Sequence, residues 1–380
     1  MWWRDAIGAR AMTRRAIFGA MVFAGAACAP TLAGAQSGVL VQGVADVELW
    51  KTDARSALLA RNDGRVAPLG RLHLWGAVGL PAGVTLYALG EVEGGPATDE
   101  TEVEVDQAGV RWARSRALVL DAGIINTPVG AFVGRRLSNR NPLVGAPDAY
   151  PVTYPLGLQL SGATGMIDWR AAVVSLPVTN EQYTPEHPGA RARPAIGAGI
   201  TPLTGLRIGA SWTAGSYLER DTPAGYLDAG RRWHAYDQRV YALDLQASRG
   251  YAELWAEVAR TEYDVPKRGA PLRGTAGYIE ARWTFTPRLY VAARAERNLY
   301  PFIQPLDDVN DWIANATDLR DLEAGIGFRP SPSRIVKLSW RRDNWVVGDA
   351  LREFLPNGYA VAMQLSQSFD VMDLVDRARR

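Results

Sequence analysis

Three arginines lie close together in residues 121–157, a stretch without a strand or helix pattern in its centre: Arg135, Arg136 and Arg140. A guanidinium stays charged, and its planar donor fork matches a carboxylate or a phosphate. Asp121 precedes the arginines and could complete a transverse electric field across a narrow passage. A long irregular insertion in a compact domain is usually functional. We therefore expect residues 126–155 to fold into an opening and narrow it, with these four residues at the constriction.

Other side chains with catalytic or metal-binding potential are few. The chain has three histidines, His73, His187 and His234, and one cysteine, Cys28. None of them belongs to a spacing typical of a metal site. The sequence contains no phosphate-binding glycine loop, and nothing in it indicates a nucleophile beside a base. We therefore predict no metal, no cofactor and no enzymatic activity.

The N-terminus has the features of an export signal. Arg14 and Arg15 precede the apolar run 16–27, and small residues occupy the cleavage region 33–35, so residues 1–35 are predicted to be a signal peptide that starts at Met12. Without this segment, 38 of the 42 basic and 39 of the 40 acidic residues remain, and no cysteine. This near-neutral charge gives no support for nucleic-acid binding, and the mature chain can form no disulfide.

After the signal, runs of about ten residues alternate apolar with polar side chains, as in β-strands with two unlike faces. We count sixteen such runs from Val39 to Phe369, of which 156–161 and 195–200 are the shortest. The connections alternate strictly between short and long, which is typical of transmembrane barrels with short periplasmic turns and long extracellular loops. The sequence predicts an all-β fold: a transmembrane antiparallel β-barrel over residues 36–370, followed by a periplasmic tail at 371–380.

The two faces of these strands differ in charge. An arginine on the lipid face near the bilayer centre costs ~2–4 kcal/mol, so the register that keeps charges in the lumen is strongly favoured. Acidic residues outnumber basic ones on the predicted lumen face. The predicted pore lining includes Arg170, Arg207, Arg282, Arg294, Lys337, Arg341, Glu280 and Glu296.

With these features the chain resembles the outer-membrane porins, and among them the phosphate-selective porin O/P family. Residues 122–130 lead from a strand through Pro128 into the long third loop, which is similar to that family's constriction loop. The last run is similar to the C-terminal strand by which such barrels are recognised for insertion, with an outward face of Tyr359, Val361, Met363, Leu365 and Phe369. The chain departs from the family in having only three lysines, of which Lys337 alone is predicted to face the lumen.

The resemblance implies a location in the bacterial outer membrane and assembly as a homotrimer. It also implies contact with the barrel-assembly machinery, outer-membrane lipid and lipopolysaccharide. We expect a porin for passive diffusion of small hydrophilic solutes, with anions such as phosphate as candidates.

Alternatives remain at this point. The chain could be a substrate-specific sugar or dicarboxylate channel, or a non-conducting barrel used as an adhesin or scaffold. In the last case loop aromatics could bind a partner: Tyr217, Tyr226, Trp233, Tyr236 and Trp312. The three loop arginines could also pair with wall carboxylates and only hold the loop, or lie on an outer loop that binds lipopolysaccharide.

Overall fold

The computed structural model describes residues 38–56, 58–98, 101–126, 128–148, 153–175, 178, 191–218, 220, 222–299, 318–346 and 355–373. The predicted signal peptide, the loop residues His187 and Trp312, and tail residues 374–380 lie outside these ranges. Residues 371–373 form a helical turn after the last strand. In the described part of the chain, no helix is long and apolar enough to cross a bilayer.

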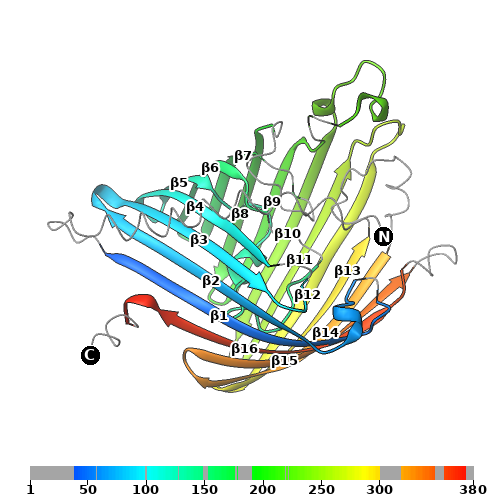
Figure 1. Ribbon diagram of the computed structural model, residues 1–380. Coiled ribbons are helices and arrows are strands. Elements are labelled where there is room, and N and C mark those ends of the chain that lie inside the picture. The colour runs from blue at the N-terminus through cyan, green and yellow to red at the C-terminus, as the bar shows by residue number, and fades with distance from the viewer. Residues whose placement is uncertain are drawn as a thin grey trace.

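Sixteen antiparallel strands form one closed barrel, as the sequence predicted (Figure 1). The strands of the first half are β1 (Val39–Thr52), β2 (Ala67–Leu80), β3 (Val84–Gly94), β4 (Glu102–Ser115), β5 (Leu118–Ile124), β6 (Leu156–Thr164), β7 (Ile167–Val174) and β8 (Arg193–Leu203). Those of the second half are β9 (Leu206–Ser216), β10 (Asp237–Arg249), β11 (Ala252–Tyr263), β12 (Leu272–Thr286), β13 (Leu289–Leu299), β14 (Asp318–Ser331), β15 (Arg334–Val346) and β16 (Gly358–Asp370). The sixth and eighth strands are longer than the sequence pattern indicated. Their ends are rich in glycine, proline and threonine, which hide the alternation of apolar and polar residues.

The barrel closes where the first and last strands meet, side by side in Figure 1. Leu49 of β1 lies opposite Met363 of β16 in an antiparallel pairing that continues to Gly43 and Phe369. Closure leaves no unpaired strand edge to face lipid. The Phe369 ring lies over Gly43 and leaves no space there for a Cβ atom.

The connections differ in length between the two ends of the barrel. At one end they are tight turns, such as η2 (Pro81–Gly83). At the other end they are long and include η1 (Asn62–Gly64), η3 (Phe132–Arg135), η4 (Ala224–Tyr226) and η5 (Trp233–Ala235). The β9–β10 connection, with η4 and η5, extends beyond the rim (Figure 1). We refer to the long-loop end as the extracellular end.

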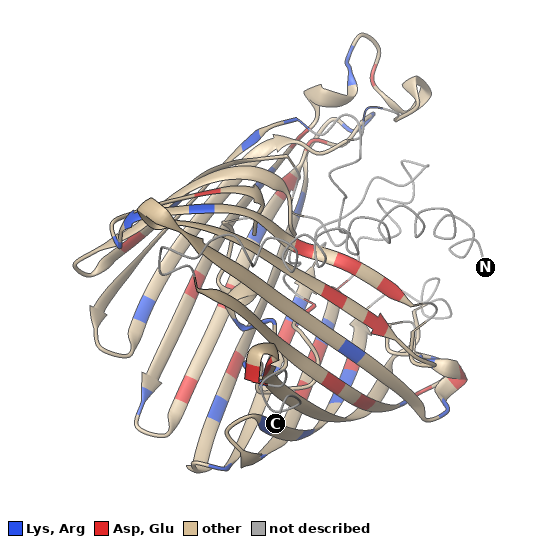
Figure 2. Ribbon diagram, turned by 60° about the vertical axis from the view of Figure 1, so that its left-hand side comes forward, with Lys and Arg blue, Asp and Glu red and all other residues tan. Residues whose placement is uncertain are grey.

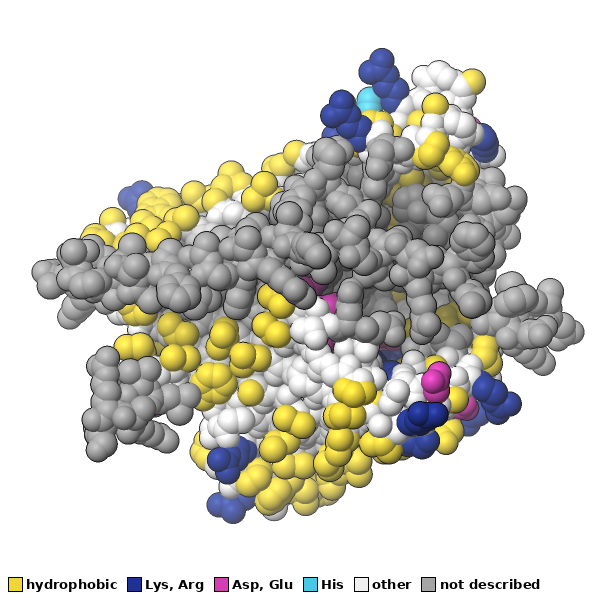
Figure 3. Space-filling model, in the orientation of Figure 1, with side chains coloured by type: hydrophobic (Ala, Val, Ile, Leu, Met, Phe, Trp, Pro, Cys, Tyr) yellow, Lys and Arg dark blue, Asp and Glu magenta, His cyan; other side chains and the backbone are white. Residues whose placement is uncertain are grey.

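Outside a bulge in β4, the two faces of the wall follow the predicted register. On β12, Ile279 and Trp283 are exposed on the outside, whereas Tyr278 and Glu280 are buried inside. Hydrophobic side chains accordingly cover much of the outer surface seen in Figure 3, and charged side chains gather near its margins. Inside the barrel, basic and acidic residues occur on the same strands (Figure 2). An apolar exterior around a charged interior is the arrangement of a membrane-spanning barrel.

Candidate pore constriction

The described residues of the connection between β5 and β6 (125–126, 128–148 and 153–155) fold into the barrel; we call this connection the inner loop. Its first part is held by lumen-facing groups of β9 and β11. The Gly130 N–H donates a hydrogen bond to Ser211 Oγ at 3.0 Å, and the Ala131 N–H donates to Glu257 Oε2 at 3.0 Å. Farther along, the Tyr290 hydroxyl of β13 donates to the Pro142 carbonyl at 3.0 Å. The loop therefore has fixed contacts around a large part of the inner wall.

Lys337 of β15 is a strong attachment point of this loop. Its Nζ atom donates hydrogen bonds to the carbonyl oxygens of Ser138, Asn141 and Leu143 at 2.8, 3.0 and 3.0 Å. The residue is 1% exposed. Lys337 lies inside the barrel as predicted, but its three donors are used by the loop backbone and none is left for a solute.

Arg135 and Arg136 are neighbours in the sequence and bind opposite sides of the barrel. Arg135 Nη1 lies 2.5 Å from Glu280 Oε1 of β12, and its guanidinium lies over the Trp255 ring at 4.2 Å. Arg136 pairs with Glu91 of β3 and lies 3.0 Å from Asp106 Oδ1 of β4. Around the sixteen-stranded barrel β4 is eight positions from β12, the largest separation possible, and β3 is seven positions away. The two arginines therefore brace the inner loop across the lumen.

Arg140 and Asp121 have different environments. Arg140 is exposed, and in the described part of the chain its guanidinium makes a hydrogen bond to the Gly134 carbonyl at 3.3 Å but no ion pair. Asp121 lies on the β5 wall and pairs with Arg111 of β4 at 2.7 Å. No described contact joins Asp121 to the loop arginines. Of the four residues predicted at the constriction, three are on the inner loop and only Arg140 presents an uncompensated charge.

Arg294 of β13 is the centre of a buried ionic network. It is 1% exposed and lies 3.1 Å from Glu280, 2.7 Å from Glu296 and 2.6 Å from Glu323. It also donates to the Gly145 carbonyl of the inner loop at 3.0 Å. Because Glu280 also binds Arg135, this network connects the wall to two points of the loop, Arg135 and Gly145.

The remaining predicted lining arginines also face the lumen, and their charges are used in contacts. Arg170 donates to the Gly130 carbonyl of the inner loop at 3.0 Å. Arg207 lies 2.7 Å from Asp168 and pairs with Asp244 as well. These contacts link neighbouring strands across the inner surface of the wall.

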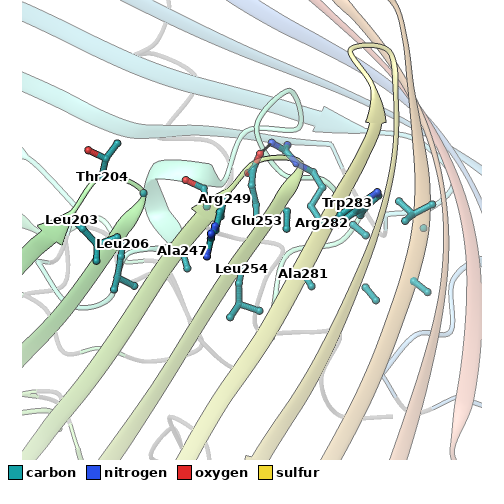
Figure 4. A pocket seen from close by; sticks show the side chains of 18 residues that line it. Leu203, Thr204, Leu206, Ala247, Arg249, Glu253, Leu254, Ala281, Arg282 and Trp283 are labelled. Carbon is teal, nitrogen blue, oxygen red and sulfur yellow. Dashed lines mark hydrogen bonds and ion pairs between the residues drawn. The ribbon is translucent and has the colours of Figure 1, made fainter.

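Arg282 and Arg341 complete this set. Arg282 pairs with Glu253, and both point to the inner side of the wall while Leu254 points to the other side (Figure 4). Arg341 lies 3.3 Å from Asp321 and also pairs with Asp148 of the inner loop. The predicted wall residues are therefore inside the barrel, but they form a neutralised network instead of a row of free cations.

A β-bulge at Asp106 adds a carboxylate that the sequence pattern did not predict. Leu89 lies opposite Gln107 and Gly90 lies opposite Val105, so Asp106 is an extra residue in β4. A bulge reverses the alternation of side chains beyond it. Asp106 is 1% exposed and faces the lumen. Regular alternation along β4, starting from the inward-facing Arg111, would instead place it on the outer face.

The same bulge directs Glu102 and Glu104 inward. They lie opposite Glu93 and Glu91 of β3, which gives two cross-strand pairs of like charge. Like charges in this position repel and need nearby cations. Arg71 of β2 supplies one, since it lies 2.9 Å from Glu91 and also pairs with Glu93.

A cavity of about 410 Å³ lies between this acidic wall and the inner loop; we call it the vestibule. Its floor includes Ser138, Asn141 and Val144 of the loop. Its charged lining consists of the carboxylates of Glu48, Glu91, Glu93, Glu102, Glu104 and Asp148 and the guanidinium groups of Arg61, Arg71, Arg136 and Arg341. The carboxylates exceed the arginines by two.

Beside the vestibule, the barrel wall brings together three potential metal ligands. One ligand atom each of His73, Glu91 and Asp106 lies within 4.8 Å of the others, and all three residues are buried. They come from three strands, so the sequence alone gave no metal-like spacing. Arg136 already pairs with both carboxylates, and its guanidinium supplies the cation at this place.

Arg193 is another internal residue that the sequence did not reveal, because it was expected in a loop. It is the first residue of β8, is 1% exposed, and donates to Thr213 Oγ1 and the Gln238 carbonyl at 3.1 Å each.

Comparisons with known proteins address the fold. No protein-family model matches this sequence, and no curated protein matches it. Among solved structures, OmpF of Salmonella typhi in complex with daunomycin has a TM-score of 0.61 at 11% identity, over 88% of this chain and 98% of that one. The anion-selective porin from Comamonas acidovorans has a TM-score of 0.54 at 12% identity, over 88% and 100% of the two chains.

OmpT, an outer membrane protein of Vibrio cholerae, has a TM-score of 0.56 at 8% identity, over 89% of this chain and 99% of that one. The fold is that of bacterial outer-membrane β-barrels. At these identities the similarity concerns architecture, and the solutes must be inferred from the inner loop and the vestibule.

Proposed function

We propose that this protein is a channel in the bacterial outer membrane for passive diffusion of small hydrophilic solutes. The closed barrel, its apolar outer surface and its charged interior support a water-filled path through a bilayer. In this proposal the inner loop is the constriction, since it is braced across the lumen by Arg135 and Arg136. The channel works without catalysis, as a homotrimer inserted by the barrel-assembly machinery.

Within this function we propose a preference for cations and neutral solutes over phosphate and other anions. Selectivity depends on the local charge where the path is narrow. The observation that carries this proposal is the vestibule lining, with six carboxylates and four guanidinium groups. The expected passage of phosphate depended on free loop arginines, and Arg135 and Arg136 are both paired with wall carboxylates.

Single-channel recording in planar bilayers tests this function. With a tenfold KCl gradient, we expect discrete conductance steps and a reversal potential whose sign indicates that K⁺ is more permeant than Cl⁻. A reversal potential of the opposite sign would contradict the cation preference. A folded barrel without conductance steps would contradict the channel itself and favour the adhesin or scaffold alternative. Block of the current by maltooligosaccharide or succinate would identify a specific channel.

A further inference from the structure

The outer surface of the barrel carries an arginine on each of six neighbouring strands, β10 to β15. Each is exposed and lies within five residues of the extracellular end of its strand. At a rise of about 3.3 Å per residue, all are within roughly 15 Å of that end along the strand. We call this set the arginine belt: Arg239, Arg260, Arg273, Arg297, Arg320 and Arg342.

Strand pairing confirms that these arginines belong to the outer face. Arg239 lies opposite Glu262, which in turn lies opposite Arg273, so these three form a row across β10, β11 and β12. Arg297 lies opposite Arg320 in a second row across β13 and β14. The residues next to them in sequence, such as Val240 and Leu319, are buried inside the barrel.

The belt has an excess of positive charge. Glu262 lies 3.1 Å from Arg273 and 3.6 Å from Arg260, and Asp318 lies 2.9 Å from both Arg297 and Arg320. Each carboxylate is thus shared by two arginines. With Asp237 at the end of β10, the extracellular halves of these outer faces carry three acidic residues and six arginines. A guanidinium has five N–H donors, so one shared carboxylate leaves most of them available.

This charge is concentrated on one side of the barrel, and Lys51 on the outer face of β1 is a further cation near the extracellular end. The outward residues in the extracellular halves of the described strands β2 to β9 are uncharged, for example Gly70, Val92, Leu158 and Ile196. An arginine on the lipid face costs up to ~2–4 kcal/mol at mid-bilayer but only ~0–1 kcal/mol near an interface. Six arginines at one rim of one side therefore need an explanation other than chance placement at a tolerated depth.

Aromatic residues indicate the depth of the belt. Tyr241 and Trp340 are exposed on the same outer face and lie two residues nearer mid-strand than Arg239 and Arg342, respectively. Aromatic girdles lie at the boundary between hydrocarbon and headgroups. Arg260 lies opposite Tyr241, at this boundary, and Arg239 and Arg342 lie just outside it. The belt is therefore at the level of the lipid headgroups of the outer leaflet.

We propose that the arginine belt binds the phosphate groups of lipopolysaccharide on the β10–β15 side of the barrel. Arginine forms charge-assisted and bidentate hydrogen bonds with phosphate, and neighbouring arginines can hold the two phosphates of one lipid A headgroup. This inference depends on the outer-membrane location and is independent of conduction.

The test uses the full-length folded barrel in detergent micelles and measures its affinity for diphosphoryl lipid A. The triple variant Arg273→Ala/Arg297→Ala/Arg320→Ala should bind at least about tenfold more weakly, because each basic residue near an anionic lipid surface contributes on the order of 1 kcal/mol. The matched control removes three exposed arginines at the other end of the barrel, Arg114→Ala/Arg249→Ala/Arg288→Ala, and should change the affinity less than twofold.

A second arm changes only the ligand and so does not depend on folding of a variant. The unmodified barrel should bind dephosphorylated lipid A at least about tenfold more weakly than diphosphoryl lipid A. Equal affinity for the two lipids, or unchanged affinity of the belt variant, would overturn the proposal. The belt variant should keep its single-channel conductance, so loss of the channel function and loss of lipid binding are distinguishable.

Discussion

Arg136 of the inner loop lies 3.0 Å from the carboxylate of Asp106, a residue that a β-bulge turns into the lumen. The contact joins the loop to the same acidic wall that lines the vestibule. It also explains why an arginine in this loop does not by itself indicate anion transport. A charge that is already paired positions the loop, whereas an unpaired charge acts on solutes.

Replacement of Arg136 should destabilise the barrel. Arg136→Met leaves the buried Asp106 without its cation and leaves Glu91 with Arg71 alone, and removal of one partner of a buried ion pair costs about 3–5 kcal/mol. The free energy of unfolding in urea, with the barrel folded into lipid vesicles, measures this loss. The control Arg140→Met removes a loop arginine without an ion pair and should change stability by less than about 0.5 kcal/mol. Equal decreases in the free energy of unfolding of the two variants would contradict the role of Arg136 in holding the inner loop.

Replacement of Lys337 should release the middle of the inner loop. Lys337→Met leaves three loop carbonyls without their donor, at a cost of about 1–3 kcal/mol for each buried group that finds no new partner. Single-channel records should then show more frequent current fluctuations, since the loop is less firmly held. Lys267→Met, on an exposed loop, is the control and should leave the records unchanged. If Lys337→Met shows no increase in current fluctuations, the other contacts are enough to hold the inner loop and the prediction is wrong.

The vestibule carboxylates should set ion selectivity. Glu102→Gln/Glu104→Gln removes two charges from the acidic wall, and the K⁺/Cl⁻ permeability ratio should fall by on the order of twofold or more. The matched control is Glu262→Gln, because this carboxylate lies on the outer face of β11. A ratio that changes in the control but not in the double variant would locate the selectivity elsewhere.

The seam between β1 and β16 should be sensitive to one methyl group. Gly43→Ala forces the Phe369 ring away from β1, and overpacking of this kind costs about 1–3 kcal/mol. The temperature at which the folded barrel loses its faster mobility in gel electrophoresis should decrease. Gly76→Ala, also on the outer face of a neighbouring strand, meets no atom within 4 Å and should not lower it. Equal unfolding temperatures for the two variants would contradict the tight seam.

Much of the fold could be predicted because its determinants are local. On β12 and β13, an error of one residue would place Glu280 and Arg294 in lipid, so the alternation alone determines which face is inside. The strict alternation of short and long connections predicted which end of the barrel carries the long loops. These properties are contained in segments of ten to twenty residues, and the barrel repeats them sixteen times.

The candidate site was predicted only in part, because its contacts join distant residues. The sequence predicted that the loop with Arg135, Arg136 and Arg140 enters the barrel, but it did not determine which carboxylates meet these arginines. Asp106 faces the lumen because one extra residue in β4 reverses the alternation of inward and outward side chains. No local sequence pattern indicates this bulge. Closure of the barrel then brings β3 and β12 to opposite sides of one loop. The sequence by itself therefore determined the wall, and the tertiary structure decided which charges of the loop are paired and which remain to act on a solute.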